Sequence, residues 1–302
     1  MTIPPGTDMK SPVLLKRLAW IVPLSLIVLY AIATLWFVIR EESLVYPRTR
    51  ELDSLAYGVT RLPVTLLTND GLRLAAWAMP DTDQAASQVW VLFLHGNGGN
   101  VSTPMQFYSL LLERGVHILA LDYRGYGQSD GDPTEPGLAL DADAAYEYLV
   151  RQLHVPGRNI VLYGHSLGGA VAINLATYAR ASGLIVEGTF TSLANRVQEI
   201  YPIIPVKWIM KNRFDSIEKI PHVTIPKLFI HSANDDVVPI EHGRQLFAAA
   251  SDPKEFLEVS GGHFTACVQD EEKFFGGVSR FIHEVTGATL RVPHPPITGN
   301  SQ

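Results

Sequence analysis

Apolar residues are distributed along this 302-residue chain in two ways. Residues 18–39 form one uncharged run, whereas the later apolar segments are short and separated by polar turns. A run of about 20 apolar residues is long enough for a helix to cross the hydrocarbon core of a bilayer. We therefore predict an N-terminal tail at 1–17, a single-pass transmembrane helix at 18–39 and a connecting segment at 40–61.

A cleaved signal peptide is the alternative interpretation of the first apolar run. Its apolar region would be shorter and would end at a small-x-small site, which Ala31-Ile32-Ala33 offers. The run continues past this site as far as residue 39, which favours an uncleaved membrane anchor. Basic residues precede and follow the run in nearly equal number, so the charge rule for orientation almost cancels. We expect a cytoplasmic N-terminus with the folded domain outside.

From residue 62 the pattern predicts a hairpin followed by strands that alternate with helices. Strand-like runs at 64–68 and 72–79 flank Asn69-Asp70-Gly71, and an Asp-Gly turn between two such runs is typical of a β-hairpin. Further strands are predicted at 89–94, 116–121, 159–163, 183–186, 225–231 and 255–259, and helices at 105–114, 137–153, 170–180, 241–250 and 269–283. A hairpin leading into repeated strand–helix units implies an α/β fold with a mostly parallel sheet covered by helices on both faces.

The same pattern sets the limits of the domain. We expect a folded domain at 62–286 and a disordered, proline-containing tail at 287–302. Within the domain, 189–224 is predicted to be a short lid with an apolar centre at 200–210. This centre either packs on the core or forms an apolar rim that receives an acyl chain or touches the bilayer. Three acidic residues of the helix at 137–153 are expected at exposed positions: Asp141, Asp143 and Glu147.

Composition excludes some classes of function. The formal net charge is −6, and no Lys/Arg cluster lies next to aromatic residues, so nucleic acid is not an expected partner. The one cysteine, Cys267, rules out an internal disulfide and any cysteine-based metal site. Cys267 lies near His263 in the sequence but has no activating context, so we expect it to be a small buried hydrophobic residue.

The most informative motif is Gly164-x-Ser166-x-Gly168, which lies between a predicted buried strand and a predicted helix. This arrangement is typical of a nucleophile elbow, a sharp turn that holds the serine strained and exposed. The two glycines are expected because side chains there would clash with the turn and the following helix. The N-terminus of that helix adds backbone N–H groups beside a developing oxyanion.

A serine hydroxyl needs a base to act as a nucleophile, and the base needs an orienting group. In this arrangement the acid and then the histidine follow the nucleophile along the chain, each after a late strand. His263 follows the last predicted strand, and Gly261-Gly262 lets its loop bend towards Ser166. Asp235 and Asp236 both follow the preceding strand, and spacing alone does not separate them. The other histidines of this region and elsewhere are expected to be structural or exposed: His117, His165, His231, His242 and His283.

A glycine-rich loop at 95–100 follows the strand predicted at 89–94. Such a loop can turn a backbone N–H towards a substrate carbonyl, and the residue after the nucleophile supplies a second N–H. Asn97 and Leu167 are therefore the expected oxyanion donors. A phosphate-binding loop is the alternative, but the loop lacks both the Gly-Lys-Ser/Thr ending and the dinucleotide spacing.

Five motifs occur together in this domain: His95-Gly-Asn-Gly-Gly-Asn100, Asp122-Tyr-Arg-Gly-Tyr-Gly-Gln-Ser129, Gly164-His-Ser-Leu-Gly168, Asp235-Asp-Val-Val-Pro239 and Gly262-His263. Over about 61–285 they resemble the α/β-hydrolase superfamily, and look most like membrane-anchored single-domain serine hydrolases whose eukaryotic relatives include protein depalmitoylases. The resemblance implies an eight-stranded, mostly parallel sheet and a Ser-His-Asp hydrolase without a metal or an organic cofactor. It also selects Asp235 as the acid, because the family aspartate lies four residues before the proline.

The resulting hypothesis is a membrane-anchored serine hydrolase that cleaves carboxylic esters or thioesters through an acyl-enzyme. Ser166, His263 and Asp235 would form the catalytic triad, and the substrate would be a small or lipid-like acyl compound or an acylated protein. A serine peptidase, a perhydrolase and a non-catalytic membrane-bound binding protein remain alternatives. The sequence leaves acyl-chain length and oligomeric state open.

Overall fold

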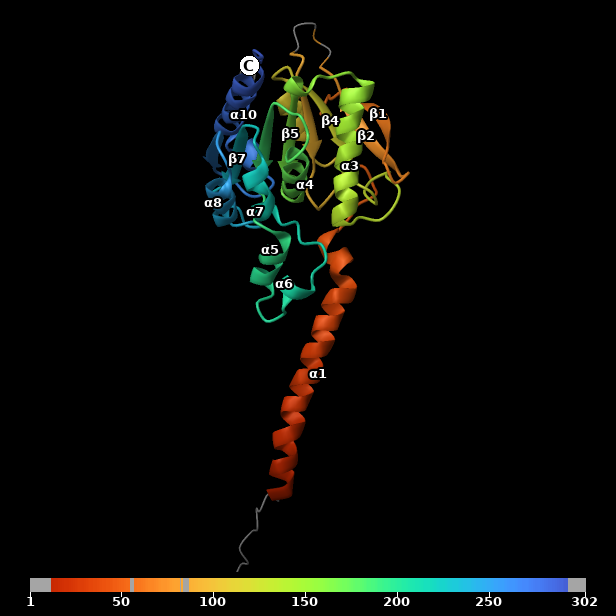
Figure 1. The fold of residues 1–302 in the computed structure, drawn as a ribbon, viewed down its shortest axis with the longest axis vertical. Helices are drawn as coiled ribbons and strands as arrows, with labels where there is room; N and C mark the ends of the chain where they lie inside the picture. The colour runs from red at the N-terminus through yellow and green to blue at the C-terminus, as the bar shows by residue number, and fades with distance from the viewer. Residues whose placement is uncertain (1–11, 55–56, 82, 84–86, 293–302) are drawn as a thin grey trace, which may run out of the picture.

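The structure, a computed structural model, describes residues 12–54, 57–81, 83 and 87–292. In this part of the chain eight strands form one sheet in the order β1-β2-β4-β3-β5-β6-β7-β8, with helices on both sides (Figure 1). The eight-stranded, mostly parallel sheet is therefore confirmed. The strands are β1 (Leu62–Leu67), β2 (Arg73–Met79), β3 (Trp90–Leu94), β4 (His117–Leu121), β5 (Ile160–His165), β6 (Gly183–Glu187), β7 (Lys227–Ser232) and β8 (Lys254–Val259).

Strand direction brings the segments that carry the predicted site to one edge of the sheet. β1 pairs with β2 and β2 with β4 in antiparallel fashion, and all other pairs are parallel. In the register of β5 and β6, His165 lies opposite Glu187, so the residues that follow these two strands leave the sheet side by side. The loops after β3, β5, β6, β7 and β8 meet at this edge, as expected for the carboxyl ends of parallel strands.

Two apolar layers cover the sheet. On β3, Leu92 and Leu94 pack in one layer with α3, α4 and α8, whereas Val91 and Phe93 pack in the other with α2 and α10. Because both faces are covered, the central strands are apolar throughout rather than alternating. The helices of the two layers are α2 (Met105–Leu112), α3 (Glu135–Glu147), α4 (Leu167–Ala176), α8 (Ile240–Ala249) and α10 (Glu271–Thr286), and the short α9 (Ala266–Gln269) precedes α10.

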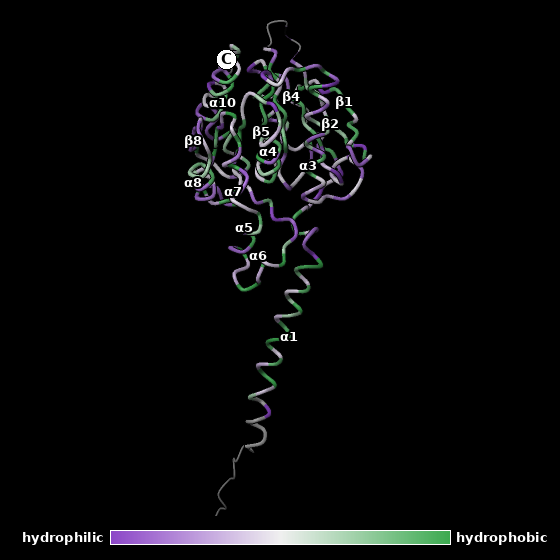
Figure 2. Tube along the Cα trace, in the orientation of Figure 1, coloured by the Kyte–Doolittle hydropathy of each residue, from purple (hydrophilic) through white to green (hydrophobic). Residues whose placement is uncertain are grey.

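The first helix, α1 (Pro12–Val45), projects away from this body (Figure 1). It is longer than the predicted span of 18–39: it begins within the predicted tail and continues through the first residues of the predicted connecting segment. Ala19–Val45 contains an 18-residue window with a mean hydropathy of 2.4 and is long and apolar enough to cross a membrane. Hydrophobic residues follow most of its length (Figure 2), and most of its large apolar side chains are exposed. It is a candidate transmembrane helix.

The predicted lid at 189–224 lies beside the end of α1 (Figure 1). It contains α5 (Leu193–Ile200), α6 (Val206–Ile209) and α7 (Ser216–Lys219). The Tyr30 hydroxyl of α1 donates a hydrogen bond to the Ile203 carbonyl at 3.2 Å. The rings of Phe37 and Tyr201 meet edge to face, with centroids 5.9 Å apart. The lid therefore packs on α1 as well as on the sheet domain.

Asp141 departs from its predicted position on an exposed helix face. It is completely buried in α3, and its Oδ1 accepts a hydrogen bond from the Arg124 Nε at 2.9 Å. Arg124 also pairs with Asp70 of the hairpin turn at 2.8 Å. The prediction was wrong because a buried carboxylate is stable where an arginine from another segment neutralises it. Asp143 and Glu147 are partly exposed.

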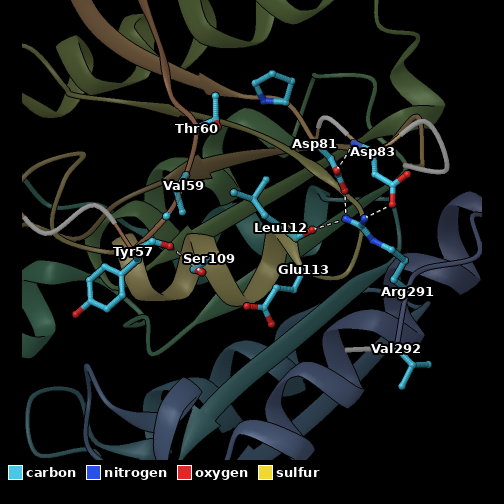
Figure 3. Close-up of a pocket in the computed structure, with 12 residues that line it drawn as sticks. Tyr57, Val59, Thr60, Asp81, Asp83, Ser109, Leu112, Glu113, Arg291 and Val292 are labelled. Carbon is cyan, nitrogen blue, oxygen red and sulfur yellow. Dashed lines mark hydrogen bonds and ion pairs between the residues drawn. The ribbon is translucent and has the colours of Figure 1, made fainter. Parts of the chain in front are cut away.

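Of the predicted disordered tail at 287–302, the structure describes residues 287–292. Arg291 bonds Asp81, Asp83 and the Leu112 carbonyl (Figure 3). These contacts line an open cavity next to the amino end of β4, at the edge of the sheet opposite the predicted site. Residues 293–302, and residues 1–11 of the predicted N-terminal tail, lie outside the described residues.

Candidate active site

Ser166 occupies a sharp turn between the end of β5 and the start of α4. Its backbone has φ 53° and ψ −118°, a strained conformation for a residue with a side chain. The Ser166 N–H donates to the Glu187 carbonyl at 2.8 Å, and the Ser166 carbonyl accepts from the Gly169 N–H at 2.9 Å. The strand–turn–helix geometry predicted for the Gly-x-Ser-x-Gly motif is therefore present.

Both motif glycines are required by close backbone approach. A Cβ on Gly164 would lie 2.3 Å from the Gly168 carbonyl oxygen, and a Cβ on Gly168 would lie 2.0 Å from the Leu94 carbonyl oxygen. Neither neighbour can move aside, because both contacts are with backbone atoms. The N-terminus of α4 is thus held directly against the ends of β5 and β3.

His263 and Asp235 form a buried pair after β8 and β7. His263 Nδ1 lies 2.7 Å from Asp235 Oδ2, and both side chains are almost fully buried. The other oxygen of Asp235 accepts from the N–H groups of Val237 at 2.9 Å and Val238 at 2.7 Å. Burial raises the pKa of Asp235, but the hydrogen bond and charge of His263 and these N–H donors outweigh it, so this pKa lies below its usual value.

Asp236 takes a different position from its neighbour. Its Oδ1 lies 3.5 Å from the backbone nitrogen of His263 and does not contact the imidazole. His231, at the end of β7, has its Nε2 2.8 Å from the Val238 carbonyl and 3.6 Å from Asp235 Oδ2. The geometry therefore separates Asp235 from Asp236, which the spacing could not.

Gly188 lies between Ser166 and the imidazole of His263. No motif in the sequence indicated this position. It follows Glu187, the residue whose carbonyl binds the Ser166 N–H. A Cβ at Gly188, whose φ is 55°, would lie 3.2 Å from the His263 Cε1 and Nδ1 atoms, so a side chain there would strain the backbone and crowd the imidazole. His263 Nε2, the ring nitrogen remote from Asp235, is buried and makes no hydrogen bond in the described part of the chain, and none joins it to Ser166 Oγ. In enzymes without bound substrate, the hydrogen bond between a nucleophile and its base is often long or poorly aligned.

The two expected oxyanion donors lie at the same cavity as Ser166. Leu167 is the first residue of α4, and Asn97 lies in the loop after β3. Within the described residues neither backbone N–H donates a hydrogen bond to the protein. The Asn97 carbonyl accepts from the Tyr126 hydroxyl at 2.9 Å, and the Asn97 side chain donates to the Val45 carbonyl at 3.3 Å. The loop is therefore fixed to the last residue of α1, and the role of its N–H stays a prediction.

A second cavity, of about 260 Å³, lies behind His165 and Glu187. His165 Nε2 is 3.1 Å from the His263 carbonyl, and burial together with His263 lowers the pKa of His165 to about 3, so its ring is neutral. Glu187 accepts a hydrogen bond from the Tyr163 hydroxyl at 2.7 Å, and burial raises the pKa of Glu187 to about 7. Cys267 is buried, as expected, and burial raises the pKa of its thiol to about 12.

The described residues contain no group of three His, Cys, Asp or Glu side chains placed to hold a metal ion. Near the elbow, the ionisable groups instead bond to one another or to the backbone. Asp235, Glu187 and His165 each have such a partner. What the arrangement offers chemically is a strained serine beside a buried His–Asp pair and two free backbone N–H groups.

Comparison with known proteins agrees with this fold. Residues 91–258 match the model of the alpha/beta hydrolase family. The chain is 37% identical over 222 residues to Rv2307c of Mycobacterium tuberculosis, covering 73% of this chain and 79% of that protein. It is 31% identical over 221 residues to the Saccharomyces cerevisiae membrane protein YNL320W, covering 70% and 77%. The solved esterase Pf2001 of Pyrococcus furiosus superposes with a TM-score of 0.67 at 19% identity, covering 80% of this chain and 97% of the esterase. The chain belongs to the alpha/beta hydrolase family.

Proposed function

We propose that this protein is a serine hydrolase that cleaves carboxylic ester or thioester bonds through an acyl-enzyme. One observation carries the proposal: Ser166 lies on a strained elbow beside Gly188, against which the imidazole of the buried His263–Asp235 pair is packed. A serine, a histidine and an aspartate so placed are the three groups that acyl transfer requires.

In this mechanism Ser166 Oγ attacks the acyl carbonyl carbon while His263 Nε2 takes the hydroxyl proton. Asp235 holds the Nδ1–H and stabilises the imidazolium, and the N–H groups of Asn97 and Leu167 bind the oxyanion. The tetrahedral intermediate collapses, the ester oxygen or thioester sulfur leaves with the proton from His263, and an acyl-serine remains. Water then attacks the acyl-serine with His263 as base, which releases the carboxylic acid and restores Ser166.

We further propose that α1 anchors the enzyme as a single membrane span. Its length, its hydropathy and its exposed apolar side chains support this, as does the likeness to a yeast protein described as a membrane protein. A cytoplasmic N-terminus with the domain outside is the proposed orientation. Protease added to the outside of intact cells should digest the domain, whereas digestion only after lysis would reverse the orientation.

The activity is tested with a fluorophosphonate probe on the full-length protein in membranes. The parent should incorporate the label, and Ser166→Ala should not. Ser260→Ala is the control, because Ser260 is an exposed serine in the loop that carries His263, and it should label like the parent. Labelling of Ser166→Ala at the parental rate would assign the nucleophile elsewhere. No labelling of the folded parent would favour the non-catalytic binding protein.

Substrate panels separate the remaining alternatives. Turnover of acyl esters and thioesters above aminoacyl amides is expected. Preference for aminoacyl amides would identify a peptidase, and activity that depends on peroxide would identify a perhydrolase.

A further inference from the structure

The cavity at Ser166 is closed partly by the membrane helix. It has a volume of about 220 Å³, and its walls come from the elbow, from the lid and from the last turns of α1. Phe37, Leu44 and Val45 supply the α1 wall, and Val197 and Tyr201 are among the lid residues. Beyond Ser166 and Asn97, the lining residues with a polar group are Arg196 and Tyr201, and the Arg196 guanidinium is bonded to the Val237 carbonyl and to Glu199. The space beside the nucleophile is therefore apolar.

The α1 wall is one face of a regular helix. Phe37, Glu41, Leu44 and Val45 are spaced by four, three and one residues, which places them on the same side. Phe37 is 2% exposed and Val45 is 5% exposed, and Leu44 lines the cavity while being 40% exposed, whereas Ile39 on the opposite side is 70% exposed. The end of α1 is therefore built into the domain on one face and left free on the other.

The lid reaches along α1 to the middle of the candidate span. Because a helix rises 1.5 Å per residue, Tyr30 lies about 16 Å beyond Ala19 and about 22 Å before Val45. With a hydrocarbon core of about 30 Å that begins near Ala19, Tyr30 lies close to its middle. The Tyr30 hydroxyl contacts the Ile203 carbonyl, so the turn between α5 and α6 lies at hydrocarbon depth too. Exposed apolar side chains suit that position, since Ile203 of this turn is 79% exposed and Trp208 of the following α6 is 89% exposed.

The backbone carbonyls of this turn also have hydrogen-bond donors within the protein. The Gln198 side-chain amide donates to the carbonyls of Tyr201 at 3.0 Å, Pro202 at 3.2 Å and Ile204 at 2.8 Å. In lipid an unpaired backbone carbonyl is strongly unfavourable, so irregular backbone there needs such internal partners. The half-buried Gln198 amide, whose two N–H groups are shared among three carbonyls, supplies the internal partners that an inserted turn requires.

We propose that the cavity at Ser166 is an acyl-chain site that is loaded sideways from the bilayer, between α1 and the lid. The substrate class is an ester or thioester whose long, unbranched acyl chain lies in the adjacent leaflet, with its carbonyl at the membrane surface. This inference rests on the proposed function and adds to it that α1 forms part of the substrate site rather than only a tether. It also makes the lid a second membrane contact.

The first test narrows the cavity from the α1 side. Full-length protein in phospholipid vesicles is assayed with p-nitrophenyl butanoate and p-nitrophenyl dodecanoate, and the ratio of the two kcat/KM values is compared between variants. Leu44→Trp should lower the long-chain to short-chain ratio about tenfold, because displacing two buried methylene groups accounts for a change of that size. Ile39→Trp, on the exposed face of the same helix, is the matched control and should keep the parental ratio.

Fluorophosphonate labelling reports whether Ser166 is intact in each variant. An unchanged ratio in a Leu44→Trp protein that labels normally would overturn the acyl-chain site and leave the proposed function standing. Absence of both labelling and ester turnover in the parent would instead overturn the proposed function itself.

A second variant tests loading from the bilayer without altering the cavity. Ile203→Asp places a carboxylate on an exposed position of the lid turn, so folding is not at risk. Because a carboxylate at hydrocarbon depth is unfavourable, turnover of a long-chain ester embedded in vesicles should fall about tenfold relative to turnover of p-nitrophenyl acetate in solution. Leu67→Asp, at a position on β1 that is also largely exposed, should keep the parental ratio. Equal ratios in both variants would show that substrate does not enter beside the lid.

Discussion

The Glu41 carboxylate, near the end of α1, accepts hydrogen bonds from the backbone N–H and the side-chain amide of Asn212 in the lid, at 2.8 Å and 2.9 Å. The same oxygen accepts from the Lys211 N–H at 2.9 Å, and Glu41 is 3% exposed. Asn212 Oδ1 in turn accepts from the Tyr46 hydroxyl at 2.8 Å and from the Glu135 N–H at 2.9 Å. One buried acid and one amide therefore join α1, the lid and the start of α3.

Replacing Glu41 tests whether this contact holds the lid on α1. Glu41→Ala leaves buried N–H donors unpaired, so we expect a loss of stability of about 3 kcal/mol, from about 1–3 kcal/mol for each such donor. The lid should also become accessible to trypsin at Lys207 and Lys211. Thermal unfolding and limited proteolysis in detergent measure the two effects. Glu42→Ala, at an exposed neighbouring position, should change neither; equal proteolysis of the two variants would mean that the lid is held by other contacts.

The contact of His263 with Asp235 rather than Asp236 predicts different kinetics for two adjacent substitutions. Asp235→Asn removes the acceptor that fixes the Nδ1–H tautomer, and such a change lowers kcat by about 10⁴-fold in triads of this type. Asp236→Asn leaves the imidazole contact in place and should lower kcat by about tenfold or less. Ester hydrolysis at saturating substrate measures both. If Asp236→Asn were the more damaging substitution, the assignment of the acid would be reversed.

Some of the residues at this site could be predicted from the sequence, and others could not. The elbow and its glycines were predictable because adjacent residues impose that geometry, and His263 was predictable because the carboxyl ends of parallel strands meet. Asp235 was separable from Asp236 only through a family resemblance, since the direction of each side chain depends on the turn that Val237 and Val238 close. The role of Asn212 could not be predicted from the sequence, because its hydrogen-bond partner Glu41 is 171 residues away. A polar helix residue is normally exposed, so Asp141 could be placed only once Arg124 was seen beside it.

The close approach of α4 to β3 predicts that Gly168→Ala disrupts the elbow. The added Cβ would lie 2.0 Å from the Leu94 carbonyl oxygen, so α4 must move and carry the Leu167 N–H away from the cavity. Loss of one oxyanion donor costs about 10²–10³-fold in kcat, and overpacking costs about 1–3 kcal/mol of stability. Gly276→Ala, in open space on α10, should retain activity, and its free energy of unfolding should rise by about 0.5–1 kcal/mol. Normal activity in Gly168→Ala would mean that the position of α4 does not control the oxyanion site.

The raised pKa of Glu187 predicts a stability that falls as pH rises. Burial favours the neutral carboxyl in the folded state, with further help from Asp235, and moves its pKa from 4.5 in the unfolded chain to about 7. Below pH 4.5 both states are protonated and the neutral group costs nothing. Between pH 4.5 and pH 7 the folded chain binds more protons than the unfolded chain, so the free energy of unfolding decreases as pH rises. Above pH 7 Glu187 is ionised in both states, and the free energy of unfolding decreases no further on its account.

Glu187→Gln removes this titration while keeping an oxygen that accepts the Tyr163 hydroxyl. The stability difference between variant and parent should therefore grow in favour of the variant from pH 5 to pH 8, by on the order of 3 kcal/mol. Denaturant unfolding of the detergent-solubilised protein at several pH values measures the difference. Glu113→Gln, at an exposed position, should follow the parent throughout. Parallel curves for the parent and Glu187→Gln would show that Glu187 is already ionised at pH 5, and that the cavity behind His165 tolerates a negative charge.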